Sequence, residues 1–346
     1  MNPVERVIRK VDSAQQRNTA LAFVFGVTKK FGDDNGGVLV GNMAYSAFVS
    51  LFPLLLVLVT ILGLVASHDP SVRQKVLNAV AGQFPLIGHQ LAGNVHSLQR
   101  SSVIGLVVGL LVLIWGTTGL AQAGLFTMAQ VWNLPGPARP GYAQRLGRAI
   151  LFLGVLGLGV VVTTLLTGLD TFGHSSSLTA AAAQLLALLA NIGVYAVAFR
   201  VLTAKGIPTR ELLPGAVAGG AGWTLLQALG TFLVHHYLHS DSVYGVFATV
   251  LGLIAWIYLS VEITVYAAEI NVVRTRRLWP RALVQPPLTE ADRTSMALQV
   301  LQNQRRAEQH VDVTFADRPP EAEPASQTPR TPEEVSPPAD TPPSGS

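Results

Sequence analysis

Two carboxylates lie in an apolar stretch late in the chain, within WIYLSVEITVYAAEIN at 256–271. Glu262 and Glu269 are seven residues apart and so share one helix face, and no Lys or Arg occurs between Ser242 and Val273. A carboxyl group in an apolar helix is costly unless a proton, a cation or a hydrogen-bond donor stabilises it. Such a group can hold a proton or a polar substrate, or it can simply join neighbouring helices.

A polar layer is predicted around Glu262. Tyr258 and Tyr266 lie four residues on either side of it on the same face, and four more polar side chains lie about eleven residues into other apolar segments. These are Ser50, Gln122, Asn191 and Gln227. We expect these residues to form a substrate or proton site near mid-membrane, with Glu262 within hydrogen-bond reach of another span. Hydrogen bonding between helices is the alternative role of the hydroxyls and amides.

Glu269 lies about one turn from the end of its apolar segment. Arg200 lies at a similar depth at the end of another segment, which would allow an Arg200–Glu269 ion pair. His235 and His239 have i, i+4 spacing but lack the Glu of a zinc-protease helix, and the chain has no cysteine. We therefore predict no metal site and no cofactor. Without a water-facing carboxylate cluster or a phosphate-binding motif, we expect neither an enzyme nor a nucleic-acid partner.

Long apolar segments must position these residues. The chain has 346 residues, of which 49% are hydrophobic and 13% charged, and its mean hydropathy is +0.41. A bilayer-spanning helix needs about 20 apolar residues. Six segments qualify: Val38–Ala66, Val103–Val131, Ala149–Leu169, Leu178–Leu202, Leu212–Tyr237 and Tyr244–Val273. The sequence therefore predicts an all-α, polytopic membrane protein with six transmembrane helices.

Basic residues are concentrated in alternate connections. They are frequent before the first span, in the second and fourth loops and after the last span. The third and fifth loops have none, and the first has Arg73, Lys75 and Arg100 spread over a longer segment. Because short cytoplasmic loops carry the excess of Lys and Arg, both termini are predicted to be cytoplasmic.

Four regions are predicted along the chain. They are a cytoplasmic or interfacial helix at 1–36, the transmembrane domain at 37–275 with an external amphipathic loop at about 67–100, a basic flank with a short helix at 276–310, and a disordered Pro-rich acidic tail at 311–346. Thr289 and Asp292 have the spacing of a capping box for the short helix, which we expect to reach about Gln309.

The first region has an amphipathic pattern. Val4, Val7, Ile8 and Val11 follow the i, i+3, i+4, i+7 spacing of one helix face, with basic residues between them. Such a helix either lies on the anionic membrane surface or packs on the protein itself, and the spacing does not separate the two alternatives.

Two segments resemble the YihY/BrkB family of bacterial inner-membrane proteins. They are AYSAFVSLFPLLLVLVTILG at 44–63 and YGVFATVLGLIAWIYLSVEITVYAAEIN at 244–271, and PGAVAGGAGW at 214–223 also fits. The matching residues include Tyr45, Ser50, Pro53, Tyr244, Gly245, Glu269 and Asn271. The resemblance covers about residues 20–280, and RTRRLWPRAL after the last span is similar to the actinobacterial branch. Glu262 departs from the family pattern, since many relatives carry an apolar or amide residue there.

The resemblance implies six transmembrane helices, a multi-pass protein of the bacterial inner (plasma) membrane and a role in envelope integrity. Family members have been linked to serum resistance and to lipopolysaccharide-related lipid export, and an old family label was ribonuclease BN. Two functions stay open: a transporter of lipids or small molecules, or a non-transporting scaffold or envelope-assembly factor. Membrane lipids are the expected partners, and a homo-oligomer or an envelope-assembly partner stays open.

Overall fold

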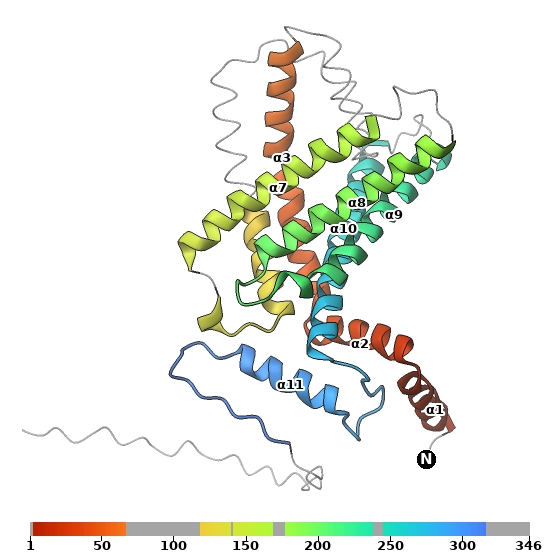
Figure 1. Cartoon of the computed structure of the whole chain (residues 1–346), viewed down its shortest axis with the longest axis vertical. Coiled ribbons are helices and arrows are strands. Elements are labelled where there is room, and N and C mark those ends of the chain that lie inside the picture. Colours follow the sequence, from red (N-terminus) through yellow and green to blue (C-terminus); the bar gives the residue numbers. More distant parts are fainter. Residues whose placement is uncertain (1–2, 67–117, 140, 169–176, 238–244, 316–346) are drawn as a thin grey trace, which may run out of the picture. The chain divides into compact units, whose positions relative to one another are not determined.

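A computed structural model describes residues 3–66, 118–139, 141–168, 177–237 and 245–315 (Figure 1). Side chains are not described at 3–7, 52–66, 160–161, 163–168, 177–180, 233–237 and 245–249. The chain divides into two units, Met1–Val311 and Asp312–Ser346, and the first contains all the helices discussed below. The described part of the chain is helical and has no strand, which confirms the all-α prediction for these residues.

The helices follow the apolar segments closely. Their bounds are α1 Pro3–Arg17, α2 Thr19–Asp33, α3 Gly36–Ala66, α7 Tyr142–Gly168, α8 Ser177–Leu202, α9 Leu213–Tyr237, α10 Gly245–Arg276 and α11 Glu290–Gln302, with short 3-10 turns η2 Gly136–Ala138 and η4 Thr209–Glu211. Residues 118–131 are also helical. Of the predicted span Val103–Val131 only this second part is described, and the external loop at 67–100 lies outside the described residues.

Two described helices are long and apolar enough to cross a membrane. The qualifying segments are Ala181–Leu202 in α8 and Val250–Arg276 in α10, and Gly36–Leu51 in α3 is a shorter apolar segment. The six-span count therefore stays a prediction.

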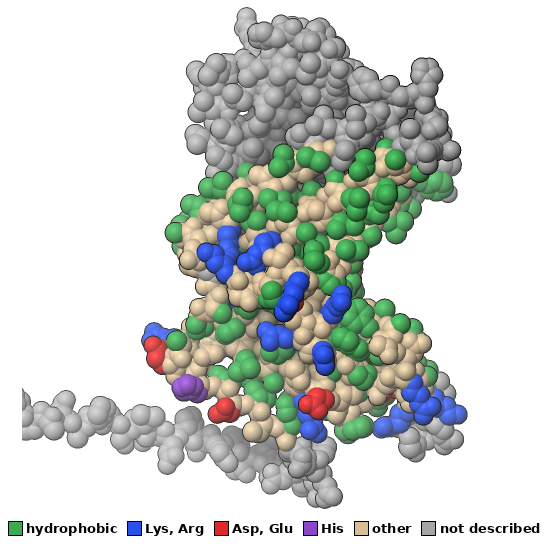
Figure 2. Space-filling view, viewed as in Figure 1, with side chains coloured by type: hydrophobic (Ala, Val, Ile, Leu, Met, Phe, Trp, Pro, Cys, Tyr) green, Lys and Arg blue, Asp and Glu red, His purple; other side chains and the backbone are tan. Residues whose placement is uncertain are grey.

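α10 is the central helix of the described bundle. It packs against α2, α3 and α9, and α8 packs between α7 and α9. The buried face of α10 includes Val265, Ala268 and Val272, whereas Leu158 of α7 and Leu225 of α9 are 65% and 70% exposed. Hydrophobic side chains cover the upper described part of the molecule in Figure 2, and Lys and Arg gather below them. This distribution is typical of helices that face lipid.

α2 lies crosswise to α10, near the end of that helix (Figure 1). It begins at Asn18, whose side-chain oxygen accepts the amides of Ala20 and Leu21 at 3.0 and 3.3 Å. It ends before Asn35, which has the left-handed φ of 54° that Asn tolerates, and the chain then turns into α3. The sequence had not indicated α2 as a separate helix.

α1 and α11 complete this end of the bundle. In α1 the polar residues Asp12 and Gln15 face the protein, whereas Val11 is 54% exposed. Thr289 and Asp292 form the predicted capping box of α11, but the helix ends at Gln302 rather than near Gln309. We call the meeting of α1, α2, residues 131–136, the end of α10 and residues 278–304 the junction.

Candidate functional site

The predicted polar layer is only partly connected in the structure. Asn191 is buried and its Nδ2 donates to Thr224 Oγ1 at 3.0 Å, which joins α8 to α9. Ser50 is buried but donates within its own helix, to the Ala47 carbonyl at 2.7 Å. Glu262 is half-buried and has no hydrogen bond or ion pair with any described residue. Its expected bond to another span is therefore not present among these residues.

Burial increases along the predicted stripe of α10. Tyr258 is 39% exposed, Glu262 and Tyr266 are half-buried, and Glu269 is 0% exposed. The Tyr266 ring stacks on Phe31 of α2, with ring centroids 4.2 Å apart. The stripe thus leads from an exposed end to the buried contact between α10 and α2. Gln122 and Gln227 are half-buried on their own helices.

Glu269 pairs with a lysine that the sequence had not indicated. Its Oε2 lies 3.7 Å from Nζ of Lys30, which is also 0% exposed. Neither carboxyl oxygen of Glu269 accepts a hydrogen bond from a described residue. The predicted Arg200–Glu269 ion pair is not formed, because Arg200 donates to the Ile207 carbonyl at 2.8 Å in the loop after its own helix.

Lys30 also binds a second carboxylate. Its Nζ donates to Asp34 Oδ2, one turn further along the chain, and to the Val131 carbonyl at 3.1 Å. Burial raises the pKa of Asp34, although the Lys30 charge and hydrogen bonds act in the opposite direction. Two carboxyl groups therefore share one ammonium group in the interior. The cluster has one excess negative charge unless a proton or a cation neutralises it.

Left-handed residues bring three chain segments to this cluster. Asn35, Asn133 and Arg277 have φ values of 54°, 47° and 53°, and each lies just after a helix end. Asn133 Nδ2 then donates to Asp34 Oδ1 at 3.4 Å and to Gln302 Oε1 at 2.7 Å. This amide links the cluster to the end of α11.

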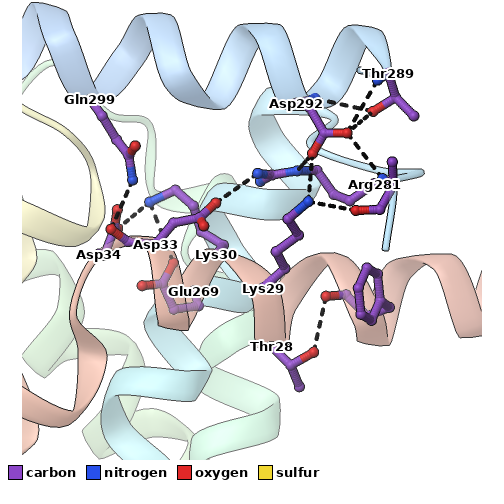
Figure 3. Close-up of polar contacts among 12 residues, drawn as sticks. Thr28, Lys29, Lys30, Asp33, Asp34, Glu269, Arg281, Thr289, Asp292 and Gln299 are labelled. Carbon is purple, nitrogen blue, oxygen red and sulfur yellow. Dashed lines mark hydrogen bonds and ion pairs between the residues drawn. The ribbon is translucent and has the colours of Figure 1, made fainter. Parts of the chain in front are cut away.

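A second network beside the cluster is better satisfied (Figure 3). Asp292 is 0% exposed and accepts hydrogen bonds from Arg281 Nε at 2.6 Å, Lys29 Nζ at 2.9 Å and the Ala282 amide at 3.0 Å. Arg281 Nη2 also donates to Asp33 Oδ2 at 2.6 Å. Burial acts to raise the pKa of Asp292, but these donors outweigh it and hold that pKa far below its usual range.

Asn271 has a positional role. Its Oδ1 accepts the amide of Gly215 at 2.6 Å, in the first turn of α9. Helix amides in the first turn have no partner within their own helix, so Asn271 caps α9 from the neighbouring helix. A Cβ at Gly215 would overlap the Ala267 carbonyl and the Asn271 amide, which explains the glycine.

The other residues of the resemblance lie elsewhere. Tyr45 is 71% exposed on α3, and Gly245 is the first residue of α10. α3 runs through Pro53, whose side chain is not described, and Tyr244, His235 and His239 are likewise outside the described side chains.

A comparison with protein families gives a match. The family model described as virulence factor BrkB matches residues 27–289, which is most of the chain. The chain belongs to the virulence factor BrkB family. The matched region of this BrkB family protein includes Lys30, Asp34, Glu269, Asn271 and Arg281.

Bacterial membrane proteins are similar to this BrkB family protein over much of its length. A UPF0761 membrane protein of Pseudoalteromonas atlantica is 25% identical, with 68% of this chain and 80% of that protein covered. One of Alcanivorax borkumensis is 23% identical, with 73% and 60% covered. A Bacillus subtilis protein with the provisional name ribonuclease-like protein YfkH is 23% identical, with 68% and 89% covered. No solved structure matches. The protein is thus a bacterial membrane protein.

The sequence of this BrkB family protein contains one indication of the cluster formed by Lys30, Asp34 and Glu269. KKFGDD at 29–34 places Lys30 and Asp34 at i, i+4, a spacing that favours an ion pair. A charged run before an apolar span is equally typical of a solvated segment at the membrane surface. The topology prediction uses the basic residues before the first span in this sense. The pairing of Lys30 with Glu269 depends on α2 crossing the end of α10, which local spacing does not predict.

Proposed function

We propose that this BrkB family protein is a membrane transporter of a lipid or a small polar molecule, and that a proton bound at Glu269, Lys30 and Asp34 controls it. One observation carries the proposal: Glu269 is fully buried in an apolar helix, and neither of its oxygens has a described hydrogen-bond donor. A carboxylate retained only for stability is expected to be surrounded by donors, as Asp292 is. Buried, incompletely paired carboxyl groups in membranes are typical of proton and substrate pathways.

The cluster connects proton binding to helix packing. A proton on Glu269 would remove the excess negative charge and weaken the attraction that holds α10 to Lys30. Lys30 would then remain bound to Asp34 within α2 and its following turn. A weaker contact with α2 would remove one of the restraints on α10, which would still pack on α3 and α9, and would allow α2 and α10 to shift relative to each other.

The transport path in this proposal follows the stripe of α10 that carries Glu262, Tyr258 and Tyr266. Ser50, Gln122, Asn191 and Gln227 are proposed to line it. The increase in burial from Tyr258 to Glu269 supports this direction, because a polar group entering along the stripe would reach the cluster.

The contacts at the junction support placing several segments on one side of the membrane. Gln15 Nε2 donates to the Arg281 carbonyl at 2.7 Å, and the Gly136 amide donates to the Gln304 carbonyl at 2.8 Å. A bilayer cannot pass between groups that share hydrogen bonds, so these segments belong to one aqueous side. The excess of Lys and Arg in them supports the cytoplasmic side.

A non-transporting scaffold is the second candidate. The satisfied network around Arg281 and Asp292 favours it, because such a network fixes helix ends and needs no moving part.

Reconstitution separates the two candidates. The full chain would be incorporated into vesicles of phosphatidylethanolamine and phosphatidylglycerol that contain a fluorescently labelled lipid and an internal pH dye. We expect faster lipid movement between leaflets than in protein-free vesicles, together with proton uptake along an imposed gradient. Glu269→Gln should abolish the dependence on the gradient, whereas Glu308→Gln, at an exposed position, should leave it unchanged. Wild-type vesicles that match protein-free vesicles in both readouts would favour the scaffold.

A further inference from the structure

One face of α2 presents apolar side chains outward. Leu21 and Val24 are 55% and 60% exposed, and Thr28, at the i+7 position of the same face, is also exposed. The opposite face is packed on the protein and includes the fully buried Lys30. A helix that buries a lysine and exposes leucine and valine has the pattern expected where the surroundings are lipid rather than water.

The direction of this face agrees with a lipid environment. In Figure 3, Thr28 points away from α11, toward the side on which α10 continues from Glu269 into its apolar segment. Since α2 lies crosswise to α10 (Figure 1), its outward face would lie along the surface of a bilayer that α10 crosses.

Basic side chains flank the same helix. Arg17 is exposed just before α2, and Arg274, Arg276 and Arg277 are exposed at the end of α10. α2 contacts that end directly, because Phe23 packs edge-on against Trp279, with ring centroids 5.2 Å apart. None of these four arginines forms an ion pair with a carboxylate in the described part of the chain. Their charges would match the phosphates of an anionic leaflet.

We propose that α2 is an interfacial helix that binds an anionic lipid surface, with Leu21 and Val24 among the acyl chains and Arg17, Arg274 and Arg277 on the lipid phosphates. A second copy of the chain fits this face less well, because it would bring the same arginines together without counter-charges. The proposal does not depend on transport. It assigns the exposed face of α2 to lipid and leaves the buried face, with Lys30, to the protein.

The absence of cysteine from the chain makes a direct test feasible. Val24→Cys and Glu308→Cys variants of the full chain would each carry one spin label, in nanodiscs of phosphatidylcholine with or without phosphatidylglycerol. We expect the label at 24 to be more accessible to oxygen than to a water-soluble nickel complex, and the label at 308 to show the reverse. Phosphatidylglycerol should move the label at 24 deeper, and Arg274→Gln with Arg277→Gln should remove that effect.

Three results would overturn the proposal. A label at 24 that meets the nickel complex as often as the label at 308 would place α2 in water. Close label–label distances between two copies at position 24 would assign the face to a dimer. Equal depth with and without phosphatidylglycerol would exclude binding to anionic headgroups. Leu21→Cys serves as a second position on the same face if the Val24 variant does not give a single elution peak.

Discussion

Asp292 and Glu269 are both buried, beside Lys29 and Lys30, but they differ in the number of hydrogen bonds they accept. Asp292 accepts hydrogen bonds from Arg281, Lys29 and a backbone amide, whereas Glu269 accepts none from a described residue and lies 3.7 Å from the Lys30 ammonium group. A carboxylate with several donors stabilises a fold in its charged form, and one without them is easily neutralised. The first is therefore expected to control stability, and the second to control the response to protons.

Asp292→Asn should destabilise the protein. The change leaves the buried Arg281 without its fully buried carboxylate partner, although Asp33 remains bonded to it, so we expect a loss of about 3 kcal/mol. Thermal unfolding of the detergent-solubilised protein, followed by size-exclusion chromatography, measures the change. Glu290→Gln, an exposed neighbour on the same helix, is the control and should change the midpoint little.

The lowered pKa of Asp292 predicts that the stability of the protein depends on pH. The pKa of Asp292 in the folded state is below its unfolded value of about 3.9, so the stability it contributes is fully present above that value. This contribution is lost as the pH falls from about 5 toward the folded pKa. Wild type should therefore lose more stability than Asp292→Asn between about pH 5 and about pH 3. Parallel losses in the two proteins would contradict the assignment.

Glu262→Gln should leave stability nearly unchanged, because Glu262 is half-buried and has no described hydrogen bond to lose. If Glu262 carries protons along the proposed path, the variant loses the pH dependence of transport between pH 5 and 8 while its melting temperature stays the same. Wild-type behaviour of Glu262→Gln across this range in the reconstituted vesicles would remove Glu262 from the proposed path.

At this scale the sequence was informative about residue types but not about their contacts. Glu269 was identified from its unusual place in an apolar helix, and Asn271 from the family resemblance. Their neighbours Lys30 and Gly215 were not, because both contacts arise where one helix crosses or approaches another. Arg200 was chosen as the cation of Glu269 by depth alone, and depth does not specify which helix is adjacent.

At the scale of helices, length and apolarity predicted the long elements well. α3, α7, α8, α9 and α10 coincide closely with five of the six segments expected to span the membrane, and only the second part of the remaining segment is described. α2 was missed because its 15 residues mix an apolar half with a charged half and do not have the length of a span. The crosswise position of α2 depends on contacts with Val273, Leu278 and Trp279, far away in the chain.

Gly215→Ala should disrupt the contact between α9 and α10. The added methyl group would meet the backbone of α10 rather than a flexible side chain, so relief requires the helices to separate. We expect a loss of about 1–3 kcal/mol or failure to fold. Gly193→Ala on α8 is the matched control, because nothing lies within 4 Å of the position that its new methyl group would take, and alanine favours a helix. Equal melting temperatures of the two variants would contradict the role of Gly215.

At the scale of the whole molecule, two truncations distinguish α11 from the tail. Removing residues 312–346 should leave membrane insertion and stability unchanged, because the composition of this segment cannot form a core. Removing residues 290–346 also deletes Asp292, Gln299 and Gln302, which bond to Lys29, Asp33 and Asn133 within the junction, and should lower the yield of folded protein. Detergent-extracted protein measured by size-exclusion chromatography compares them. Equal yields would mean that α11 does not stabilise the membrane domain.

The predicted topology has its own test. Reporter fusions at Pro137 and Gly206 are expected to lie in the cytoplasm, and fusions near Gly88 and Ser176, which are outside the described residues, on the other side. The physical reason is the alternation of basic loops, and the hydrogen bond between Gly136 and Gln304 supports placing Pro137 with the C-terminal segment. An external reading at Gly206 would contradict the six-span topology.

The contacts of the junction join residues that are synthesised at very different times. Lys29 and Asp292 are 263 residues apart, so a ribosome that adds about 5–20 residues per second makes the lysine about 13–50 seconds before its carboxylate. Throughout that interval Lys29 and Asp33 have emerged without the groups that later bind them. A segment made late therefore completes the contacts of one made early, and a nascent chain that stalls before α11 would leave the charge of Lys29 without the carboxylate that pairs with it.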